Sequence, residues 1–243
     1  MDPPTFTAHN IELSDGTQTL PGAPLIGAEP TSVSYLRTLR LLCPPPARVA
    51  DLGCLEGGYA VALARAGYDV LAIEGQEGNY ATCRWVADRV ALPNLRFVLD
   101  DVRNLRRHGT FDAVLCAGLL YHLDRPVAFL RLLGEVTRTL LLLTTHYATE
   151  GGRERDVYPL SAELVKHEGR LGRWFDEPPS AWSAVGNPRS FWLERRHLLQ
   201  AVIDAGFPLV FEQFDVLGDV VANRDDEERL ISCFVGVKPG EAP

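Results

Sequence analysis

The sequence predicts a single α/β domain with a seven-stranded, mostly parallel sheet, helices on both faces and an antiparallel C-terminal edge. Three observations support this prediction. Short strand-like runs alternate with helical segments from residue 48 to residue 144. Several of these runs are apolar through most of their length, as strands covered on both faces are. The last two strand-like runs follow one another without a clear helix between them, which favours an antiparallel pair at one edge.

The individual elements follow from apolar spacing, capping residues and helix-breaking residues. Thr31 or Ser32 can cap the first helix, and Asn79 and Asp124 are cap candidates for two later ones. Gly67 stands where a glycine commonly ends a helix. Helices are expected at 31–42, 57–66, 79–90, 126–136 and 195–205, and strands at 48–52, 70–73, 95–99, 111–116, 139–144, 210–217 and 230–237.

Two segments fall outside this alternation. Residues 1–30 are rich in Pro, Gly, Thr and Asp and are expected to form an irregular arm, in which His9 and its neighbours could act as a lid. Residues 147–191 fit no regular pattern and are predicted to be a long insertion. Long irregular segments inside compact domains usually carry function. We therefore expect both segments to cover the substrate side of the domain.

Composition excludes several classes of protein. The formal net charge is -8, which argues against a general nucleic-acid binder because such proteins need a broad basic surface. Five cysteines, without metal-ligand spacing, favour buried free thiols in a reducing cytosol. The first residues lack the basic and apolar regions of a signal peptide, and the longest apolar run is too short to span a bilayer. A cytoplasmic protein with no membrane partner is expected.

The strongest motif is a glycine-rich turn between the first strand and the next helix, within the run VADLGCLEGGY at Val49–Tyr59. Gly53 allows a tight turn, and Gly57 and Gly58 remove side chains where a ligand must approach the backbone. The helix that follows offers N–H groups at its start. A purely structural turn is the alternative. The position of the motif, directly after Asp51 and the first strand, favours a ligand site.

Acidic residues follow the next two strands. Glu74 ends an apolar strand about 20 residues after Asp51, where a carboxylate can accept hydrogen bonds from two ribose hydroxyls. Asp101 and Val102 follow the third strand, where a carboxylate and an apolar side chain can hold an adenine ring. Solvated acids at strand ends are the alternative in both cases. Because ligands bind at the carboxyl ends of such strands, the ribose role is favoured for Glu74.

Together these residues resemble the class I S-adenosylmethionine-dependent methyltransferases. The Asp-Leu-Gly-Cys-x-x-Gly turn, the acid after the second strand and the Asp-Val after the third match that family's cofactor motifs in order and spacing, over about residues 39–147. The resemblance implies a Rossmann-like fold, methyltransferase activity and S-adenosylmethionine as the cofactor. The cofactor-binding residues that it implies are Asp51, Gly53, Cys54, Gly57, Glu74, Asp101, Val102, Ala117 and Gly118.

The resemblance also assigns parts of the cofactor to these residues. The turn flanks the methionine part, the acid of the second strand binds ribose, the Asp-Val pair holds adenine, and Ala117 with Gly118 faces the sulfonium region. One departure is visible, since Leu55, followed by Glu56, stands where the family often has Gly. The same residue disfavours the alternative of a nicotinamide-dependent oxidoreductase, whose GxGxxG turn needs a second glycine there.

A histidine after the fifth strand is the candidate general base. His146 should open onto the substrate side, and an imidazole with an ordinary pKa of about 6.5 can take a hydroxyl proton near neutral pH. A role in capping the strand is the equal alternative. Tyr121 and His122 lie in a loop that resembles that of the tRNA wobble-uridine carboxymethyltransferases and of many small-molecule methyltransferases. We expect both to contact cofactor or substrate, with His122 in a structural or contact role.

The insertion places aromatic residues beside polar ones, as a site for a polar ring requires. His167, Glu168, Trp174 and Asn187 are the candidate acceptor-binding residues, and a small satellite core is the alternative. We expect O-methylation of a sugar, an oligosaccharide or a glycosylated metabolite. A tRNA-modifying (carboxy)methyltransferase and a non-catalytic cofactor-binding partner subunit are the alternatives. No metal site is expected, because the spacing of His146, His167 and Glu168 matches no ligand motif, and a homodimer is left open.

Overall fold

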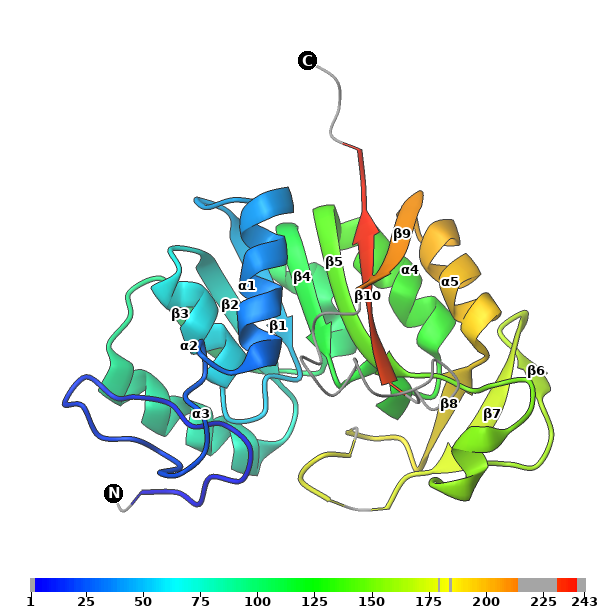
Figure 1. Cartoon of the computed structure of the whole chain (residues 1–243), viewed down its shortest axis with the longest axis horizontal. Helices are drawn as coiled ribbons and strands as arrows, with labels where there is room; N and C mark the ends of the chain where they lie inside the picture. The colour runs from blue at the N-terminus through cyan, green and yellow to red at the C-terminus, as the bar shows by residue number, and fades with distance from the viewer. Residues whose placement is uncertain (1–2, 179, 184, 214–230, 240–243) are drawn as a thin grey trace.

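The computed structural model describes residues 3–178, 180–183, 185–213 and 231–239. Its main body is a seven-stranded sheet in the order β3-β2-β1-β4-β5-β10-β9 (Figure 1). The five strands from β3 to β5 pair in parallel, and β10 is antiparallel to both β5 and β9. The strands are β1 (Arg48–Leu52), β2 (Asp69–Glu74), β3 (Leu95–Leu99), β4 (Phe111–Ala117), β5 (Thr137–His146), β9 (Leu209–Gln213) and β10 (Ile231–Val237). The fold class expected from the sequence is confirmed; residues 214–217 and 230 of the expected last strands lie outside the described residues.

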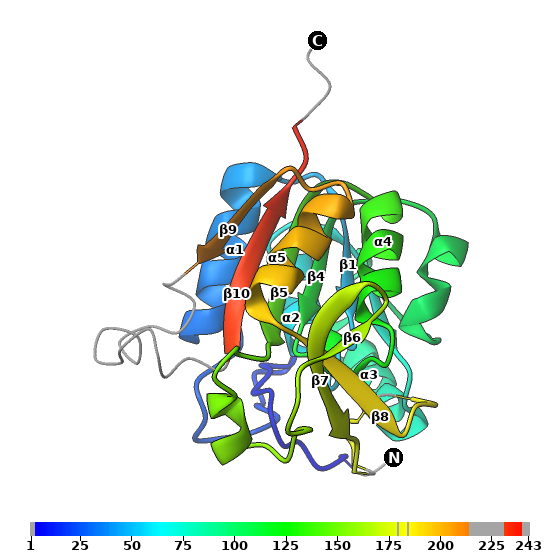
Figure 2. The same cartoon turned by 90° about the vertical axis from the view of Figure 1, so that its right-hand side faces the viewer.

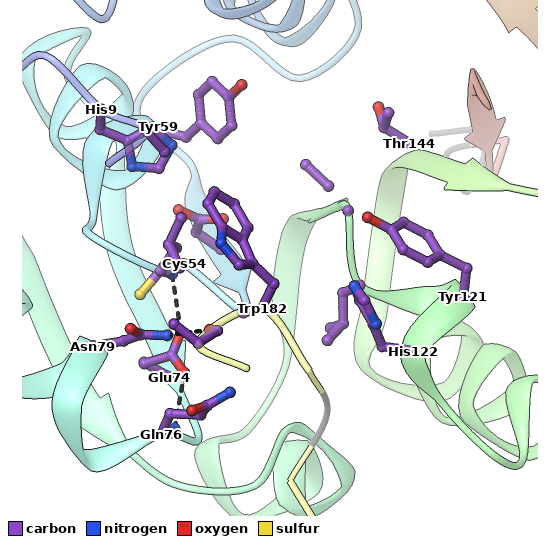
Figure 3. Close-up of a pocket in the computed structure, with 18 of the residues that line it drawn as sticks. His9, Cys54, Tyr59, Glu74, Gln76, Asn79, Tyr121, His122, Thr144 and Trp182 are labelled. Atoms are coloured by element: carbon purple, nitrogen blue, oxygen red, sulfur yellow. Dashed lines mark hydrogen bonds between the residues drawn. The ribbon is translucent and has the colours of Figure 1, made fainter. Parts of the chain in front are cut away.

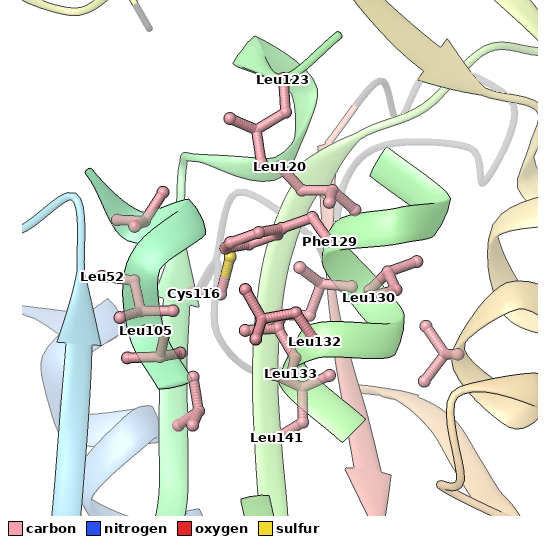
Figure 4. Packing of buried hydrophobic residues seen from close by; sticks show 14 of the residues in the cluster. Leu52, Leu105, Cys116, Leu120, Leu123, Phe129, Leu130, Leu132, Leu133 and Leu141 are labelled. Atoms are coloured by element: carbon pink, nitrogen blue, oxygen red, sulfur yellow. The ribbon is translucent and has the colours of Figure 1, made fainter. Parts of the chain in front are cut away.

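Helices cover both faces of this sheet (Figure 2). They are α1 (Pro30–Leu42), α2 (Gly58–Arg65), α3 (Glu77–Val90), α4 (Pro126–Val136) and α5 (Arg195–Asp204), with short 3-10 helices η1 (Val102–His108), η2 (Leu120–His122) and η3 (Arg153–Asp156). Alternate residues of a strand point to opposite faces, so that Leu141 and Leu143 pack with α4 and α5, whereas Leu140 and Leu142 pack with α1 and α2. Figure 4 shows the first of these apolar layers.

The helices begin within two residues of the predicted positions, but three expected caps are wrong. Glu29 caps α1, because its carboxylate accepts hydrogen bonds from the backbone N–H groups of Thr31 and Ser32. The helix α3 begins at Glu77, which moves Asn79 inside its first turn. At α4 the carboxylate of Glu168 accepts from the N–H groups at the helix start, in place of Asp124. Long-range contacts, which sequence spacing does not reveal, decide the last case.

The insertion is more regular than expected. It forms a second, antiparallel sheet of β6 (Val165–His167), β7 (Arg170–Asp176) and β8 (Arg189–Leu193) at the end of the molecule where the parallel strands finish (Figures 1 and 2). Phe191 and Leu193 of β8 join the main apolar core, and a buried ion pair between Arg173 and Glu154 (2.8 Å) links β7 to η3. Among the described residues these strands pair with none of the seven strands of the main sheet, and periodicity did not predict them.

The N-terminal arm is docked rather than free. Phe6, Ile11 and Leu13 pack against apolar residues of α2 and α3, including Val61 and Val86. The arm and the small sheet lie at the same end of the main sheet (Figure 1).

All five cysteines are buried and form no disulfide, as expected. Within the described ranges, no helix combines the length and the apolar character needed to cross a membrane.

Candidate functional site

A cavity of about 380 Å³ lies at the carboxyl ends of the central parallel strands (Figure 3). The register aligns these ends, since Glu74 is level with Leu99 across β2 and β3, and Ala117 is level with Thr144 across β4 and β5. The cavity is bordered by the ends of β1, β2, β4 and β5, by the arm and by the insertion. Its lining contains the expected residues Asp51, Gly53, Cys54, Glu74, Ala117, Gly118, Tyr121 and His122.

Asp51 presents an unsatisfied carboxylate to this cavity. The residue is 2 % exposed, and its Oδ2 atom has no hydrogen-bond partner among the described residues. Burial raises the pKa of Asp51 to about 7, and the nearby Glu74 adds to the increase. A buried carboxylate without a partner is costly. The site is therefore suited to a ligand that brings a positive charge or a hydrogen-bond donor.

Glu74 is fixed by the two turns on either side of it. Its Oε2 atom accepts from the N–H of Leu55 at 2.9 Å, and its Oε1 atom accepts from the N–H of Gln76 at 2.8 Å. Burial raises the pKa of Glu74, and these backbone bonds oppose the increase. A carboxylate has about four lone-pair sites, so beyond these bonds and the nearby Asn79 side chain the group can still accept a hydrogen bond from a ligand hydroxyl.

The glycine-rich turn has the backbone conformation that the motif predicts. Gly53 has φ +67°, and a Cβ there would lie 3.2 Å from the Leu119 side chain. Leu55 also has positive φ, 54°, so it keeps a conformation typical of the glycine that the family often has at this position. Gly57 (φ +83°) does not border the cavity. A Cβ at that position would lie 2.6 Å from the Phe97 ring, so this glycine serves packing.

A smaller cavity of about 50 Å³ adjoins the first beside Glu74 and is bordered by Asp101 and Val102. Asp101 caps η1 and its carboxylate is paired with the Arg103 guanidinium at 2.6 Å. Arg103 also donates to the backbone oxygen of Val185 in the insertion. The expected adenine-binding pair therefore lies next to the expected ribose-binding acid, with the insertion above it.

The insertion is tied across the cavity by side chains that sequence analysis did not assign to the site. Gln76 donates to the backbone oxygens of Ser180 (3.0 Å) and Ser183 (2.7 Å), and Asn79 donates to that of Ala181 (2.8 Å). Between these anchor points Trp182 borders the cavity and is 53 % exposed (Figure 3). A tryptophan within the insertion was the one sequence signal available, and its position depends on these contacts.

The side of the cavity opposite Glu74 is aromatic and hydroxylated (Figure 3). The Tyr35 hydroxyl lies 2.5 Å from the Thr144 hydroxyl, and both residues border the cavity with Tyr121 and His122. The Nδ1 atom of His122 lies 3.1 Å from each carboxyl oxygen of Glu177, whose side chain is 2 % exposed. His122 thus faces the cavity with a buried carboxylate behind it.

His146 is placed differently from the expectation. Its ring stacks on Trp192, with centroids 4.9 Å apart at 15°, and has Tyr121 and Tyr158 at its edges. Tyr121 borders the cavity, whereas His146 does not. The histidine at the end of β5 is therefore separated from the cavity by an aromatic ring.

The four candidate acceptor residues of the insertion make internal contacts and do not border the cavity. Glu168 caps α4, and His167 bonds to the Asp124 backbone and packs with Trp174. Asn187 donates to the backbone oxygen of His122 at 3.0 Å. These contacts are structural, but they are not those of a separate small core. Trp174 packs against the main apolar core, and the satellite cluster is formed by Ala148, Leu160 and Trp192. No group of three or more potential metal ligands occurs in the described ranges.

Comparisons with known proteins agree with this geometry. A family model described as a methyltransferase domain matches residues 49–140. The fold superposes on the N-terminal domain of EvdMO1, solved in the presence of SAH and D-fucose, with a TM-score of 0.71 and 27% identity, over 93% of this chain and 88% of that one. The same domain with SAH bound gives a TM-score of 0.69 and 28% identity, over 86% and 81% of the two chains.

Two curated relatives match shorter segments. The ubiquinone biosynthesis O-methyltransferase of Xanthomonas campestris pv. campestris is 31% identical over 113 residues, 46% of each protein. The 23S rRNA (uracil(1939)-C(5))-methyltransferase RlmD of Thiobacillus denitrificans is 41% identical over 85 residues, 32% of this chain and 20% of that protein. The chain therefore spans between a fifth and about half of the length of these curated relatives.

Proposed function

We propose that this chain, whose fold and cofactor motifs are those of a class I S-adenosylmethionine-dependent methyltransferase, methylates a hydroxyl group of a small, uncharged polar acceptor, preferably a saccharide. The observation that carries the proposal is the arrangement of side chains around the cavity. Asp51 and Glu74 come from the neighbouring strands β1 and β2. Thr144 and His122 supply a hydroxyl group and an imidazole on the side opposite Glu74 (Figure 3), and the Tyr35 hydroxyl bonds to that of Thr144.

S-adenosylmethionine is the cofactor, and it supplies an electrophilic methyl group on a sulfonium. The residues on the acidic side fit it. Asp51 has an unpartnered buried oxygen for the α-ammonium group, and Glu74 can still accept from a ribose hydroxyl. Asp101 and Val102 border the adjoining cavity, which adjoins Glu74 and can take the adenine ring. These assignments leave the aromatic side of the cavity for the acceptor.

Two features support a neutral polar acceptor. Among the described residues that border the larger cavity there is no lysine and no arginine, so a phosphate would find no cation there. Tyrosine rings and hydroxyl groups instead suit the apolar faces and hydroxyl groups of a sugar ring. The EvdMO1 domain, solved in the presence of D-fucose, and the ubiquinone O-methyltransferase agree with a small molecule and with oxygen as the methylated atom.

We propose His122 as the base, in place of the His146 predicted from the sequence. A hydroxyl is a weak nucleophile, and general base catalysis typically contributes about 10²–10⁴-fold. His122 borders the cavity, and Glu177 binds its Nδ1 atom, which leaves Nε2 to accept a proton. The buried carboxylate then stabilises the resulting imidazolium. Asn187 holds the backbone of the same residue.

The balance of the step is simple. The acceptor oxygen forms a bond to the methyl carbon while the carbon–sulfur bond breaks, and the electron pair of that bond stays on sulfur. The hydroxyl proton passes to Nε2 of His122. The protein contributes orientation and exclusion of water, which in favourable cases are worth roughly 7–11 kcal/mol.

An RNA acceptor is the second candidate, because the RlmD relative and the loop at Tyr121 and His122 both point to RNA-modifying enzymes. The net charge of -8 argues against an RNA acceptor, and so does the lack of lysine and arginine among the described residues that border the cavity. The two candidates differ in the fraction of a cell extract that would be methylated.

The test uses S-adenosylmethionine labelled in its methyl group, incubated with the protein and fractionated bacterial extract. Label in a small polar fraction, stable to mild base and to nuclease, supports a sugar ether. Label removed by nuclease would establish the RNA candidate instead. Glu74→Ala is the control, because loss of the ribose contact should abolish cofactor binding and hence all labelling.

The base is tested with a matched pair of variants on the acceptor so identified. In His122→Asn the amide still reaches Glu177 but lacks a group at the Nε2 position, and we expect kcat to fall about 10²–10⁴-fold with little change in cofactor affinity. His146→Asn should change kcat only a few-fold. The reverse ranking of the two variants would restore His146 as the base.

A further inference from the structure

The N-terminal arm is clamped to the glycine-rich turn by one buried carboxylate. Glu56 is 4 % exposed and accepts from the backbone N–H groups of Thr7 (2.6 Å), Ala8 (3.1 Å) and His9 (2.8 Å). The hydroxyl of Thr7 donates to the same carboxylate at 2.9 Å. Three successive backbone N–H groups are thereby fixed, and the side chain of His9 is held at the edge of the large cavity, beside Tyr59 (Figure 3).

The tautomer of His9 follows from its hydrogen bond. Its Nδ1 atom accepts from the N–H of Gly58, the first residue of α2, at 3.1 Å. An accepting ring nitrogen carries a lone pair and no hydrogen, so the neutral ring has its hydrogen on Nε2. His9 is 8 % exposed, and burial lowers its pKa, which favours the neutral ring. The charges of Glu56 and Glu29 act in the opposite direction but have a smaller effect.

The position is made specifically for this ring. A Cβ on Gly58 would lie 2.6 Å from Cγ of His9, so the glycine after the turn makes room for the imidazole. The N–H at the start of α2 polarises the ring through Nδ1 and strengthens the donor at Nε2. In the described part of the chain no residue accepts from Nε2, although the ring borders the cavity.

His9 and Asp51 together form a complementary pair for an amino acid. The cavity offers one neutral N–H donor from the arm and one buried carboxylate oxygen without a partner from β1. An α-carboxylate needs the donor, and an α-ammonium needs the acceptor. Adenosine itself carries neither group.

We propose that His9 is a cofactor-binding residue, whose Nε2–H donates to the α-carboxylate of the methionine part of S-adenosylmethionine, and that Glu56 holds the arm in place for this contact. The residue that follows the departure from glycine at Leu55 thus has a role, because Glu56 brings His9 of the N-terminal arm to the cofactor cavity. The proposal rests on the cofactor assigned above and is independent of the acceptor.

The test measures dissociation constants by calorimetry for S-adenosylhomocysteine and for 5′-methylthioadenosine, which has the same adenosine and sulfur but lacks the amino acid. In His9→Asn the amide oxygen occupies the Nδ1 position and still accepts from Gly58, while the Nε2 donor is removed. Loss of one charge-assisted hydrogen bond should weaken S-adenosylhomocysteine binding about 10–100-fold. Binding of 5′-methylthioadenosine should change less than about twofold.

The matched variant is His9→Gln, whose amide nitrogen reaches the Nε2 position but whose side chain does not accept from Gly58 in the same way. It should bind S-adenosylhomocysteine more tightly than His9→Asn does, with 5′-methylthioadenosine again unaffected. Equal weakening of both ligands, or of neither, in His9→Asn would overturn the proposal. If the wild-type protein binds neither ligand, the cofactor assignment itself is wrong. That outcome differs from the one that would overturn the role of His9 alone.

Discussion

At the residue scale, the site is built from carboxyl groups that the fold buries and then leaves partly unsatisfied. Glu74 is held by two backbone N–H groups, whereas one oxygen of Asp51 has no partner among the described residues. Both pKa values are raised by burial. A ligand with complementary groups therefore relieves a cost that the folded protein carries without it.

Asp51 makes a prediction about stability and pH. Its pKa rises on folding from the ordinary 3.8 to about 7, so the native state binds more protons than the unfolded state between these values. The contribution of Asp51 to stability is complete below the unfolded pKa and is lost as pH rises through the folded pKa. We therefore expect the free energy of unfolding of Asp51→Asn, relative to that of wild type, to rise by a few kcal/mol from pH 4 to pH 8, as measured by denaturant unfolding without cofactor. Parallel pH dependence of the two proteins would contradict the assignment.

At the element scale, the second sheet and its loops position the loop that carries His122. Glu177 binds the His122 ring, Asn187 binds its backbone oxygen, and the N–H of Phe191 donates to the Leu123 oxygen at 2.9 Å. The same segment crosses the cofactor cavity at Trp182. One insertion thus contacts both sides of the cavity.

Trp182 gives an optical readout of this element. Because its indole borders the cavity, binding of S-adenosylhomocysteine should change the intrinsic fluorescence, and Trp182→Phe should remove that change. Trp174→Phe is the matched control, since Trp174 packs against His167 and Phe191 away from the cavity. A ligand-induced change that survives in Trp182→Phe would place the insertion away from the bound cofactor.

The contact between α4 and α5 sets a limit on side-chain size. A Cβ on Gly134 would lie 1.7 Å from the backbone oxygen of Ala205, so Gly134→Ala must push the two helices apart. We expect a loss of about 3 kcal/mol in unfolding free energy, measured by denaturant titration. Gly78→Ala is the control, because this exposed glycine of α3 has nothing within 4 Å, and alanine should stabilise the helix by about 0.4–1 kcal/mol. Equal effects of the two substitutions would argue against the close packing.

At the scale of the whole molecule, three segments far apart in the sequence enclose one cavity. The arm docks on α2 and α3, the second sheet shares the main core through Phe191 and Leu193, and the ends of the parallel strands form the floor. Ligand binding should therefore stabilise the arm, the insertion and the main sheet together.

Thermal unfolding tests this coupling. At a ligand concentration about 100 times Kd, S-adenosylhomocysteine should add about 2.7 kcal/mol to stability, which corresponds to a rise in Tm of about 5–10 °C for a protein of this size. Hydrogen exchange should slow in the arm and in the insertion as well as at the strand ends. Glu74→Ala should show no rise in Tm, and protection confined to the main sheet would contradict the enclosure.

The sequence alone was sufficient to predict the fold class and to name most of the residues that border the cavity beside Glu74. Alternating strands and helices, the turn after β1 and the acid that ends β2 are local patterns, and the backbone conformation at Gly53 follows from neighbouring residues. Gly57 is the exception, since its conformation suits the turn but its contact is with Phe97. Parallel strands then bring their carboxyl ends to one edge.

The tertiary structure decided which histidines face the cavity. The His122 ring bonds to Glu177, which is 55 residues away in the sequence, and the backbone N–H of His9 donates to Glu56, which is 47 residues away. His146, expected at the cavity from its place after β5, is instead enclosed by Tyr121, Tyr158 and Trp192. Local spacing determines which element a side chain belongs to. Its partners, and so its protonation state and its access to a ligand, depend on distant segments that only the folded chain brings together.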